Sequence, residues 1–252
     1  SMTIHLDTDG NGVLRIIMDN PPVNALNIND TFEIASICDS IRHKPEITVL
    51  IITATGKGFC AGVDIKELEE KEGHEGILQV NEACFQAFRA VHECAVPVIA
   101  SVNDFCLGTG IGLVGCSDVI IASSGAQFGL PEVDNGALGA LTHLERLVPR
   151  QRARQMLYTC ETATAEELHG YGTIHKHVIP EELDAASLEL ATKIASKNPL
   201  TIRAAKRSAI GIDTQDVNKS YRYEQGFTFQ LNLAGEGQRA RQEFLDGKRE
   251  KT

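Results

Sequence analysis

Short apolar runs alternate along this chain with longer segments in which apolar residues recur every three or four positions. The apolar runs are rich in β-branched residues and lie at residues 12–19, 47–54, 96–102 and 118–123. Runs of this length and composition are typical of strands, and a run that is apolar at nearly every position is typical of a strand covered on both faces. The sequence therefore predicts a sheet made mainly of buried strands.

The segments between and after these runs have the spacing of amphipathic helices. Asp30 and Glu33 resemble a capping box before a helix that extends to about residue 42. A long helix is expected over about residues 76–94 and ends before Pro97, because a residue that precedes proline rarely stays helical. The remaining segments with helical spacing are 137–149, 180–198 and nearly all of the chain from residue 199.

The order of these elements predicts the fold class. Strands alternate with helices for about 150 residues and helices alone follow, which indicates an α/β core with a helical C-terminal region. We place the core at residues 1–198 and the helical region at residues 199–252. The helical region is expected to pack on the core or on a neighbouring subunit.

Composition narrows the classes of partner. The chain has 252 residues, of which 42% are hydrophobic, and a formal net charge of -10, which argues against nucleic acid or an anionic membrane as partner. No apolar run approaches the length of a membrane span. The seven cysteines form no CxxC pair and no secretory signal is visible, so we expect reduced thiols and a cytoplasmic protein. The histidines lack metal-ligand spacing such as HExxH, so no metal site is expected.

Two glycine-rich turns follow two of the predicted strands. They read GKGFCAGVD at residues 56–64 and CLGTGIG at residues 106–112. If both turns open at the same end of a sheet, their backbone N–H groups can converge on one oxygen and form an oxyanion hole. Glycines at these positions equally suit tight strand-to-helix turns without any chemistry. Neither turn has the spacing of a dinucleotide fingerprint or a phosphate-binding loop.

One acid follows a proline shortly after the second turn. Glu132 lies in the segment FGLPEVDNG, at residues 128–136. A carboxylate held near an oxyanion hole can act as a general base. The alternative is a solvated loop acid without a catalytic role.

Three blocks of the sequence together resemble a known family. GKGFCAGVDIKE, VIASVNDFCLGTGIGLVGCSDVIIAS and AQFGLPEVDNG resemble the signature blocks of the crotonase (enoyl-CoA hydratase/isomerase) superfamily, in the same order and at similar separations. The segments PPVNALN and NPLTIRAAK are also similar to recurring segments of that family. The resemblance implies an α/β fold, a crotonase-like spiral of ββα units with a helical C-terminal region. That region serves trimerisation or covers the active site.

The resemblance also implies ligands and assembly. It implies acyl-CoA substrates whose thioester carbonyl binds in the oxyanion hole, no separate cofactor because coenzyme A is part of the substrate, and a homotrimer or a dimer of trimers. The hole donors fall on the backbone N–H groups of Val63 and Thr109, although the second position is usually glycine. The residues that the resemblance assigns to CoA and substrate binding are Ala61, Gly62, Asp64, Ile65, Lys66, Gly108, Phe227 and Lys248, with Phe244 beside the nucleotide. Lys66 is equally consistent with a solvated helix lysine.

The acids depart from the pattern of the family's hydratases. Those enzymes use two glutamates to add water to a 2-enoyl thioester, and the matching positions here are Gly112 and Glu132. A pair of carboxylates that activates one water is therefore absent at these positions. Isomerisation of a double bond by Glu132 alone stays open.

Further segments resemble one branch of the family. ECAVPVIASVNDFCLG, FGLPEVDNGALGALTHLERLVP and VNKSYRYEQGFTFQLNLAG are similar to the CoA hydrolases that open the last carbocycle in bacterial steroid degradation. The favoured reaction is thus hydrolytic cleavage of a C–C bond in a cyclic diketone-type CoA ester. Glu132 is the first candidate for the base, followed by Asp134 and His143, although Asp134 also suits a turn and His143 a helix core.

Two other functions are weighed against this reaction. One is an enoyl-CoA hydratase or isomerase of fatty-acid oxidation. The other is a non-catalytic protein of the same fold that binds CoA or RNA. The acidic net charge argues against RNA, and the retained Glu132 favours catalysis.

Overall fold

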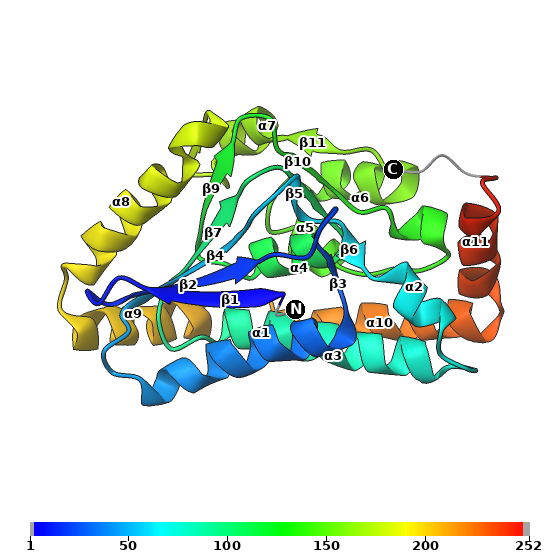
Figure 1. The fold of residues 1–252 in the computed structure, drawn as a ribbon, viewed down its shortest axis with the longest axis horizontal. Helices are drawn as coiled ribbons and strands as arrows, with labels where there is room; N and C mark the ends of the chain where they lie inside the picture. The colour runs from blue at the N-terminus through cyan, green and yellow to red at the C-terminus, as the bar shows by residue number, and fades with distance from the viewer. Residues whose placement is uncertain (1–2, 249–252) are drawn as a thin grey trace.

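The computed structural model describes residues 3–248, and its largest sheet has six strands in the order β1-β2-β4-β7-β9-β12 (Figure 1). The β1–β2 pair is antiparallel and the other four pairs are parallel. The strands are β1 (Ile4–Thr8), β2 (Val13–Met18), β4 (Val49–Ala54), β7 (Val98–Val102), β9 (Val119–Ser123) and β12 (Lys176–Val178). Four of them were expected from the apolar runs, whereas β1 and β12 were not.

The central strands are apolar at nearly every position because both faces of the sheet are covered. Val49 and Ile51 of β4 pack with Ala191 of α8 (Leu183–Ala195) on one face. The alternate residues Leu50 and Ile52 point into the main core on the other face. Side chains alternate across a strand, so a strand buried on both faces carries no polar stripe.

Two smaller sheets lie beside the large one. Their orders are β11-β10-β8-β5 and β3-β6. The strands are β3 (Ala25–Leu26), β5 (Gly58–Cys60), β6 (Gly62–Val63), β8 (Phe105–Leu107), β10 (Gln127–Gly129) and β11 (Ala163–Thr164). Strands β4, β7 and β9 of the large sheet are each followed by a strand of the four-stranded sheet, β5, β8 and β10, and then by helical structure. This is the repeated ββα unit that the resemblance implies.

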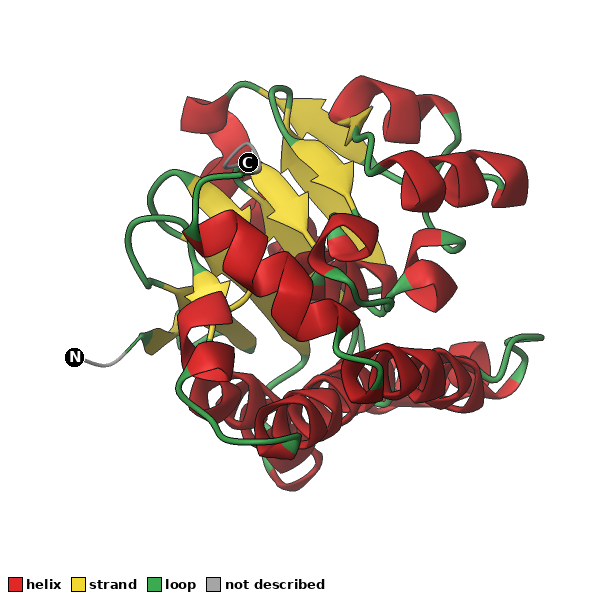
Figure 2. Ribbon diagram, turned by 90° about the vertical axis from the view of Figure 1, so that its right-hand side faces the viewer, coloured by secondary structure: helices red, strands yellow, loops and turns green. Residues whose placement is uncertain are grey.

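Helices cover the sheets and form a separate layer (Figure 2). They are α1 (Ile28–Ser40), α2 (Ile65–Glu69), α3 (Glu75–His92), α4 (Thr109–Gly115), α5 (Leu141–Leu144), α6 (Arg150–Thr159), α7 (Ala165–Gly170), α8, α9 (Pro199–Gly211), α10 (Val217–Leu233) and α11 (Glu236–Leu245), with 3₁₀ turns η1 (Ile41–His43), η2 (Glu132–Asn135) and η3 (Pro180–Glu182). Helix α10 contacts α3, α5 and α11. The C-terminal region therefore packs on the core of its own chain.

Two helix boundaries differ from those expected. Helix α1 begins at residue 28 because Asn27 is its N-cap, and the Asn27 side chain accepts a hydrogen bond from the Asp30 backbone N–H. The helix expected over 137–149 is reduced to the four residues of α5. Gly139 and Ala140 have positive φ values of 145° and 62°, which a right-handed helix does not allow.

Candidate active site

The three segments that the sequence singles out follow three neighbouring strands of the four-stranded sheet. Strand β8 pairs in parallel with both β5 and β10. The carboxyl ends of parallel neighbours meet at one edge of a sheet, so the residues that follow each strand come together there. These residues are 61–63 after β5, 108–109 after β8 and 130–132 after β10. The two glycine-rich turns therefore lie close together, as expected, and the four-stranded sheet brings them together.

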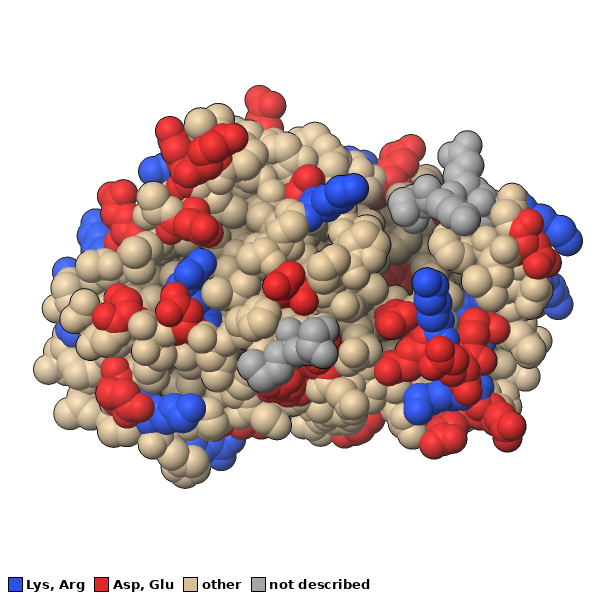
Figure 3. Space-filling view, viewed as in Figure 1, with Lys and Arg blue, Asp and Glu red and all other residues tan. Residues whose placement is uncertain are grey.

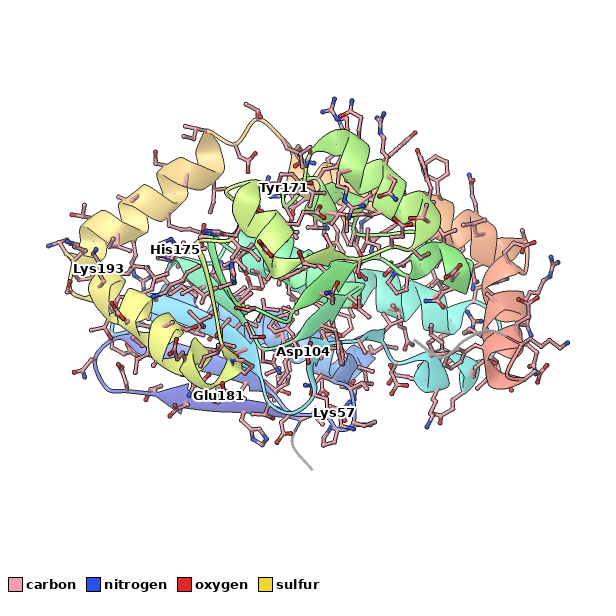
Figure 4. All side chains as sticks on the ribbon, turned by 90° about the horizontal axis from the view of Figure 1, so that it is seen from above. Lys57, Asp104, Tyr171, His175, Glu181 and Lys193 are labelled. Carbon is pink, nitrogen blue, oxygen red and sulfur yellow. The ribbon has the colours of Figure 1, made fainter. Side chains whose placement is uncertain are left out.

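The turns that lead into β5 and β8 also lie side by side. Lys57 and Asp104, which belong to these turns, lie near each other in the view from above (Figure 4). The Asn103 side-chain amide donates a hydrogen bond to the Gly56 carbonyl over 3.3 Å. The two glycine-rich segments are thus tied to each other before the short strands begin and by the pairing of β5 with β8.

Gly108 is the point at which the three segments touch. Its φ is +55°, a conformation that favours glycine. A Cβ atom on Gly108 would lie 2.6 Å from Oε1 of Glu132 and 3.3 Å from the Cα atom of Gly62. Only a residue without a side chain lets Glu132 approach the two turns this closely.

The two expected oxyanion-hole donors line the same cavity as Glu132. Val63 ends β6, and Thr109 is the first residue of α4. The first N–H groups of a helix have no acceptor within that helix, so the Thr109 N–H is free of intrahelical bonding. The Thr109 hydroxyl interacts with the thiol of Cys84 on α3, which also lines the cavity. The side chain that replaces the usual glycine is thus held against α3.

Glu132 is held with its carboxylate shielded from water. The residue as a whole retains partial exposure, but its Oε2 atom is inaccessible and has no hydrogen-bond partner within residues 3–248. Burial raises the pKa of Glu132 to about 8, with the charge of Glu224 as a smaller cause in the same direction. A carboxyl group with a pKa near neutrality can both take and return a proton at physiological pH.

The space of the second hydratase acid is filled by an aromatic ring. A Cβ atom on Gly112 would lie 2.0 Å from Cζ of Phe88, which belongs to α3 and is buried. No side chain, and therefore no carboxylate, fits at position 112 while Phe88 keeps its place. The site thus has an apolar wall where a hydratase of this pattern has an acid.

His143 belongs to the aromatic cluster behind this wall. Its ring lies 4.8 Å from the rings of both Phe88 and Tyr221, in edge-on geometry. It is fully buried, and neither ring nitrogen has a hydrogen-bond partner in the described part of the chain. Burial lowers the pKa of His143 to about 3, so the ring is neutral at physiological pH. Phe88 and Tyr221 line the cavity and His143 does not. A catalytic role for His143 remains a prediction. Its buried position outside the cavity lining does not support that role.

A groove adjoins the cavity and contains most of the expected CoA-binding residues. Five residues line both the cavity and the groove, namely Ala61, Val63, Ile65, Pro131 and Asn135. Asp64, Lys66, Asp134 and Phe244 line the groove, whereas Gly62 and Gly108 line the cavity. Asp64 caps α2 by accepting hydrogen bonds from the backbone N–H groups of Lys66 and Glu67. Asp134 thus lies one compartment away from Glu132.

Two expected binding residues lie elsewhere in the single chain. Phe227 of α10 packs edge-on against Tyr223, with 41% of its surface exposed. Lys248 lines a separate depression along α11. Neither lines the cavity or the groove, so their assignment stays a prediction that requires a neighbouring subunit.

Sequence reasoning missed several residues that line the cavity. Phe88 of α3, Tyr221 of α10 and Arg241 of α11 were given no role from the sequence. In sequence, all three lie in amphipathic helical segments, where no spacing separates a residue that lines a cavity from one that packs in the core. Among the described residues, no group of three or more His, Cys, Asp or Glu side chains is suited to holding a metal ion. Residues 3–248 also contain no helix long and apolar enough to cross a membrane.

Comparison with known proteins gives matches along nearly the whole chain. Residues 8–246 match the family model described as enoyl-CoA hydratase/isomerase. Two relatives, from Rhodococcus jostii (strain RHA1) and Mycobacterium tuberculosis, are named (7aS)-7a-methyl-1,5-dioxo-2,3,5,6,7,7a-hexahydro-1H-indene-carboxyl-CoA hydrolase. The first is 48% identical and the second 49%, each match covering 97% of this chain and 95% or 99% of the relative. A crotonyl-CoA hydratase from Syntrophomonas wolfei is 37% identical, over 78% of this chain and 77% of that protein.

Solved structures are similar to this fold over its full length. An enoyl-CoA hydratase/isomerase from Xanthobacter autotrophicus Py2 matches with a TM-score of 0.87 and 24% identity, over 99% of each chain. One from Pseudoalteromonas atlantica T6c matches with a TM-score of 0.86 and 23% identity, over 100% of this chain and 99% of that one. At this identity the likeness concerns the fold alone.

Proposed function

Because the chain belongs to the enoyl-CoA hydratase/isomerase family, we propose that it acts on an acyl-CoA thioester and opens a carbocycle of the acyl group by hydrolysing a C–C bond. The family resemblance of the three sequence blocks is confirmed by the match over residues 8–246. The choice of hydrolysis among the family's reactions is supported by the two relatives at 48% and 49% identity, which are named hydrolases of a bicyclic diketone-CoA ester.

One structural observation argues against simple hydration. Phe88 occupies the space in which a second acid would stand, since a Cβ atom on Gly112 would lie 2.0 Å from its ring. Glu132 is then the one carboxylate among the described residues that line the cavity. A single carboxyl group that exchanges its proton near neutral pH suits a reaction with one water and one base.

The chemistry of the relatives' substrate shows how such a site would work. In that molecule, C1 is a ketone of the five-membered ring, and C7a beside it is a quaternary carbon with a methyl group. The name leaves one ring double bond, between C3a and C4, in conjugation with the C5 ketone. An electron pair released at C7a would therefore spread through C3a and C4 to the C5 oxygen. The name does not number the carboxyl-CoA group, and we place it on C4, so that the same electron pair also reaches the thioester oxygen.

We assign the steps as follows. Glu132 takes a proton from water, and the hydroxide adds to C1. The resulting alkoxide collapses, the C1–C7a bond breaks, and its electron pair is delocalised as a dienolate. The backbone N–H groups of Val63 and Thr109 stabilise the negative charge on the thioester oxygen, a kind of contact that typically contributes about 3–4 kcal/mol. Protonated Glu132 returns the proton to carbon, and the product carries a new carboxyl group.

The bicyclic skeleton suggests the pathway class. A methyl group at the ring fusion beside a five-membered ring ketone corresponds to the C and D rings of a steroid. We therefore place the reaction in steroid catabolism, at the stage where the last rings are opened. The seven free cysteines, six of them buried, support a reducing cytoplasmic location.

Double-bond isomerisation is the second candidate. The lone Glu132 favours it, because one base can move a proton between two carbons of an enoyl thioester. An assay with crotonyl-CoA, a 3-enoyl-CoA and the bicyclic diketone-CoA separates the reactions. We expect turnover of the diketone to exceed that of the other two. Rapid hydration of crotonyl-CoA with an unchanged diketone would overturn the proposal.

A further inference from the structure

The cavity has a cationic end that no step above uses. Arg241 of α11 is the one lysine or arginine among the described residues that line it. Its side chain is 14% exposed, and its Nε donates a hydrogen bond to a Glu69 carboxylate oxygen on α2. An arginine has five N–H donors, so the terminal nitrogens stay available for a ligand.

A second donor points at the same space as this guanidinium. A Cβ atom on Gly237 would lie 3.0 Å from Nη1 of Arg241 and 3.6 Å from Nδ2 of Asn232. The Oδ1 atom of Asn232 is 2.6 Å from Nδ1 of His74, which leaves the amide N–H₂ group for another partner. Arg241, Asn232 and Gly237 all line the cavity. Two N–H donors beside a glycine form a geometry suited to a carboxylate.

The reaction proposed above changes the charge of the acyl group at one step. The diketone substrate is neutral outside its CoA portion, whereas hydrolytic ring opening turns the C1 ketone into a carboxylic acid that ionises. Hydration or isomerisation of an enoyl-CoA creates no such charge. A cation in the cavity therefore fits the product of ring opening specifically.

We propose that Arg241, with Asn232, binds the carboxylate created by ring opening. The inference rests on the proposed function. Holding the product as a carboxylate removes the electrophilic carbonyl that ring closure would need, and so favours the forward direction. Arginine and a carboxylate can pair through two parallel hydrogen bonds, which gives direction as well as affinity.

The acidic side chains near Arg241 oppose the binding of a carboxylate. Carboxylates gather over α2, the segment that follows it and the first residue of α3 (Figure 3). These acids are Glu67, Glu69, Glu70, Glu72 and Glu75. Glu69 is the one that holds Arg241, through Nε, and its negative charge lies beside the terminal nitrogens and repels a product carboxylate there. Removing Arg241 and removing Glu69 must therefore have opposite effects on carboxylate binding.

Two CoA esters of equal carbon number test the proposal. With the thioester on C4 of the bicycle, the new carboxylate is six carbons from the thioester carbonyl, counting both, as in adipoyl-CoA. Hexanoyl-CoA has the same length without the carboxylate. Dissociation constants of adipoyl-CoA, hexanoyl-CoA and free CoA are measured by titration calorimetry for the full-length protein, Arg241→Gln and Glu69→Gln. Neither ester contains the ring bond that is cleaved.

We expect the wild-type protein to bind adipoyl-CoA about tenfold more tightly than hexanoyl-CoA, in line with hydrogen bonds to charged groups. Arg241→Gln should lose this preference and keep its affinity for hexanoyl-CoA and free CoA within about twofold. Glu69→Gln should increase the preference, because the repelling negative charge beside the guanidinium is gone while the amide oxygen can still accept from Nε.

Three results would overturn the proposal. They are equal binding of the two esters by the wild-type protein, an equal loss of all three ligands in Arg241→Gln, or the same direction of change in both variants. The last result would assign the pair to a structural contact between α2 and α11. Failure of the proposed function is recognised separately, as the absence of diketone turnover in the wild-type protein.

Discussion

At the scale of single residues, Glu132 decides the chemistry. Its Oε2 atom is buried and has no hydrogen-bond partner within residues 3–248, its Oε1 atom lies beside Gly108, and burial raises the pKa of the carboxyl group to about 8. The base form therefore grows as the pH rises toward and past 8. We predict that kcat/KM for the diketone-CoA increases with pH and levels off above about 8. A profile that falls through this range would mean that Glu132 works as an acid in the first step.

Replacement of the carboxylate tests the same residue independently of pH. Glu132→Gln keeps the shape and removes the proton acceptor, so kcat should fall by about 10²–10⁴-fold. Binding of free CoA, measured by calorimetry, should stay within about twofold, because the groove that contains Asp64 and Lys66 is unchanged. Asp134→Asn examines the competing assignment: a loss as large as that of Glu132→Gln would transfer the role of base to Asp134.

His143 has a different signature, which concerns stability. In the folded chain the pKa of His143 is about 3, below the ordinary value of 6.5. Between these two values the unfolded chain therefore binds a proton at His143 that the folded chain does not bind. This contribution to stability is present above about pH 6.5 and is lost as the pH falls. His143→Phe should therefore gain about 2 kcal/mol relative to the wild type between pH 7 and pH 5, measured by denaturant unfolding. If the free energy of unfolding depended on pH equally in the two proteins, His143 would be protonated as readily in the folded chain as in the unfolded chain.

At the scale of elements, the contact between α3 and α4 replaces the second acid. Phe88 packs where a side chain at Gly112 would stand. Gly112→Ala should destabilise the protein by about 1–3 kcal/mol through overpacking. In a Phe88→Ala background the same substitution should cost much less, because the ring is gone. A double-mutant cycle measured by denaturant unfolding checks this, and additive effects would contradict the packing account.

The elements also show how far sequence reasoning reaches. Strands β2, β4, β7 and β9 and helix α3 were predicted, because their apolar patterns are long and regular. The strands that bring the site together, β5, β8 and β10, have three residues each, too few to show a period. The convergence of the two glycine-rich turns was predicted only as a possibility that depended on the sheet.

The side chains around the base were harder to predict than the base itself. Glu132 was found because it stands in a recognisable segment. Phe88, Tyr221 and Arg241 reach the cavity from three different helices, and their roles depend on how α3, α10 and α11 pack. Asp134 follows Glu132 closely in sequence, yet it lines the neighbouring groove. Local sequence specifies a residue type, whereas tertiary packing decides which compartment the side chain faces.

At the scale of the whole molecule, the C-terminal helices expose large apolar and aromatic side chains. Leu200 of α9 is 77% exposed, Ile212 at the end of α9 is 78% exposed, and Tyr223 of α10 is 72% exposed. We predict a trimer or a dimer of trimers of the 27.3 kDa chain, measured by analytical ultracentrifugation. A charged substitution such as Leu200→Asp should weaken the assembly. A monomer at micromolar concentration would contradict this prediction and the assignment of Phe227 and Lys248 to a neighbouring site.

The proposed reaction adds one water molecule while a ring bond is cleaved and the thioester is kept. Turnover of the bicyclic diketone-CoA in H₂¹⁸O, followed by mass spectrometry of the acyl-CoA product, measures this directly. We predict a product that gains the mass of one water, carries one ¹⁸O in a new carboxyl group and remains attached to CoA. Release of free CoA with ¹⁸O in the former thioester carboxyl, or an acyl-CoA of unchanged mass, would contradict it.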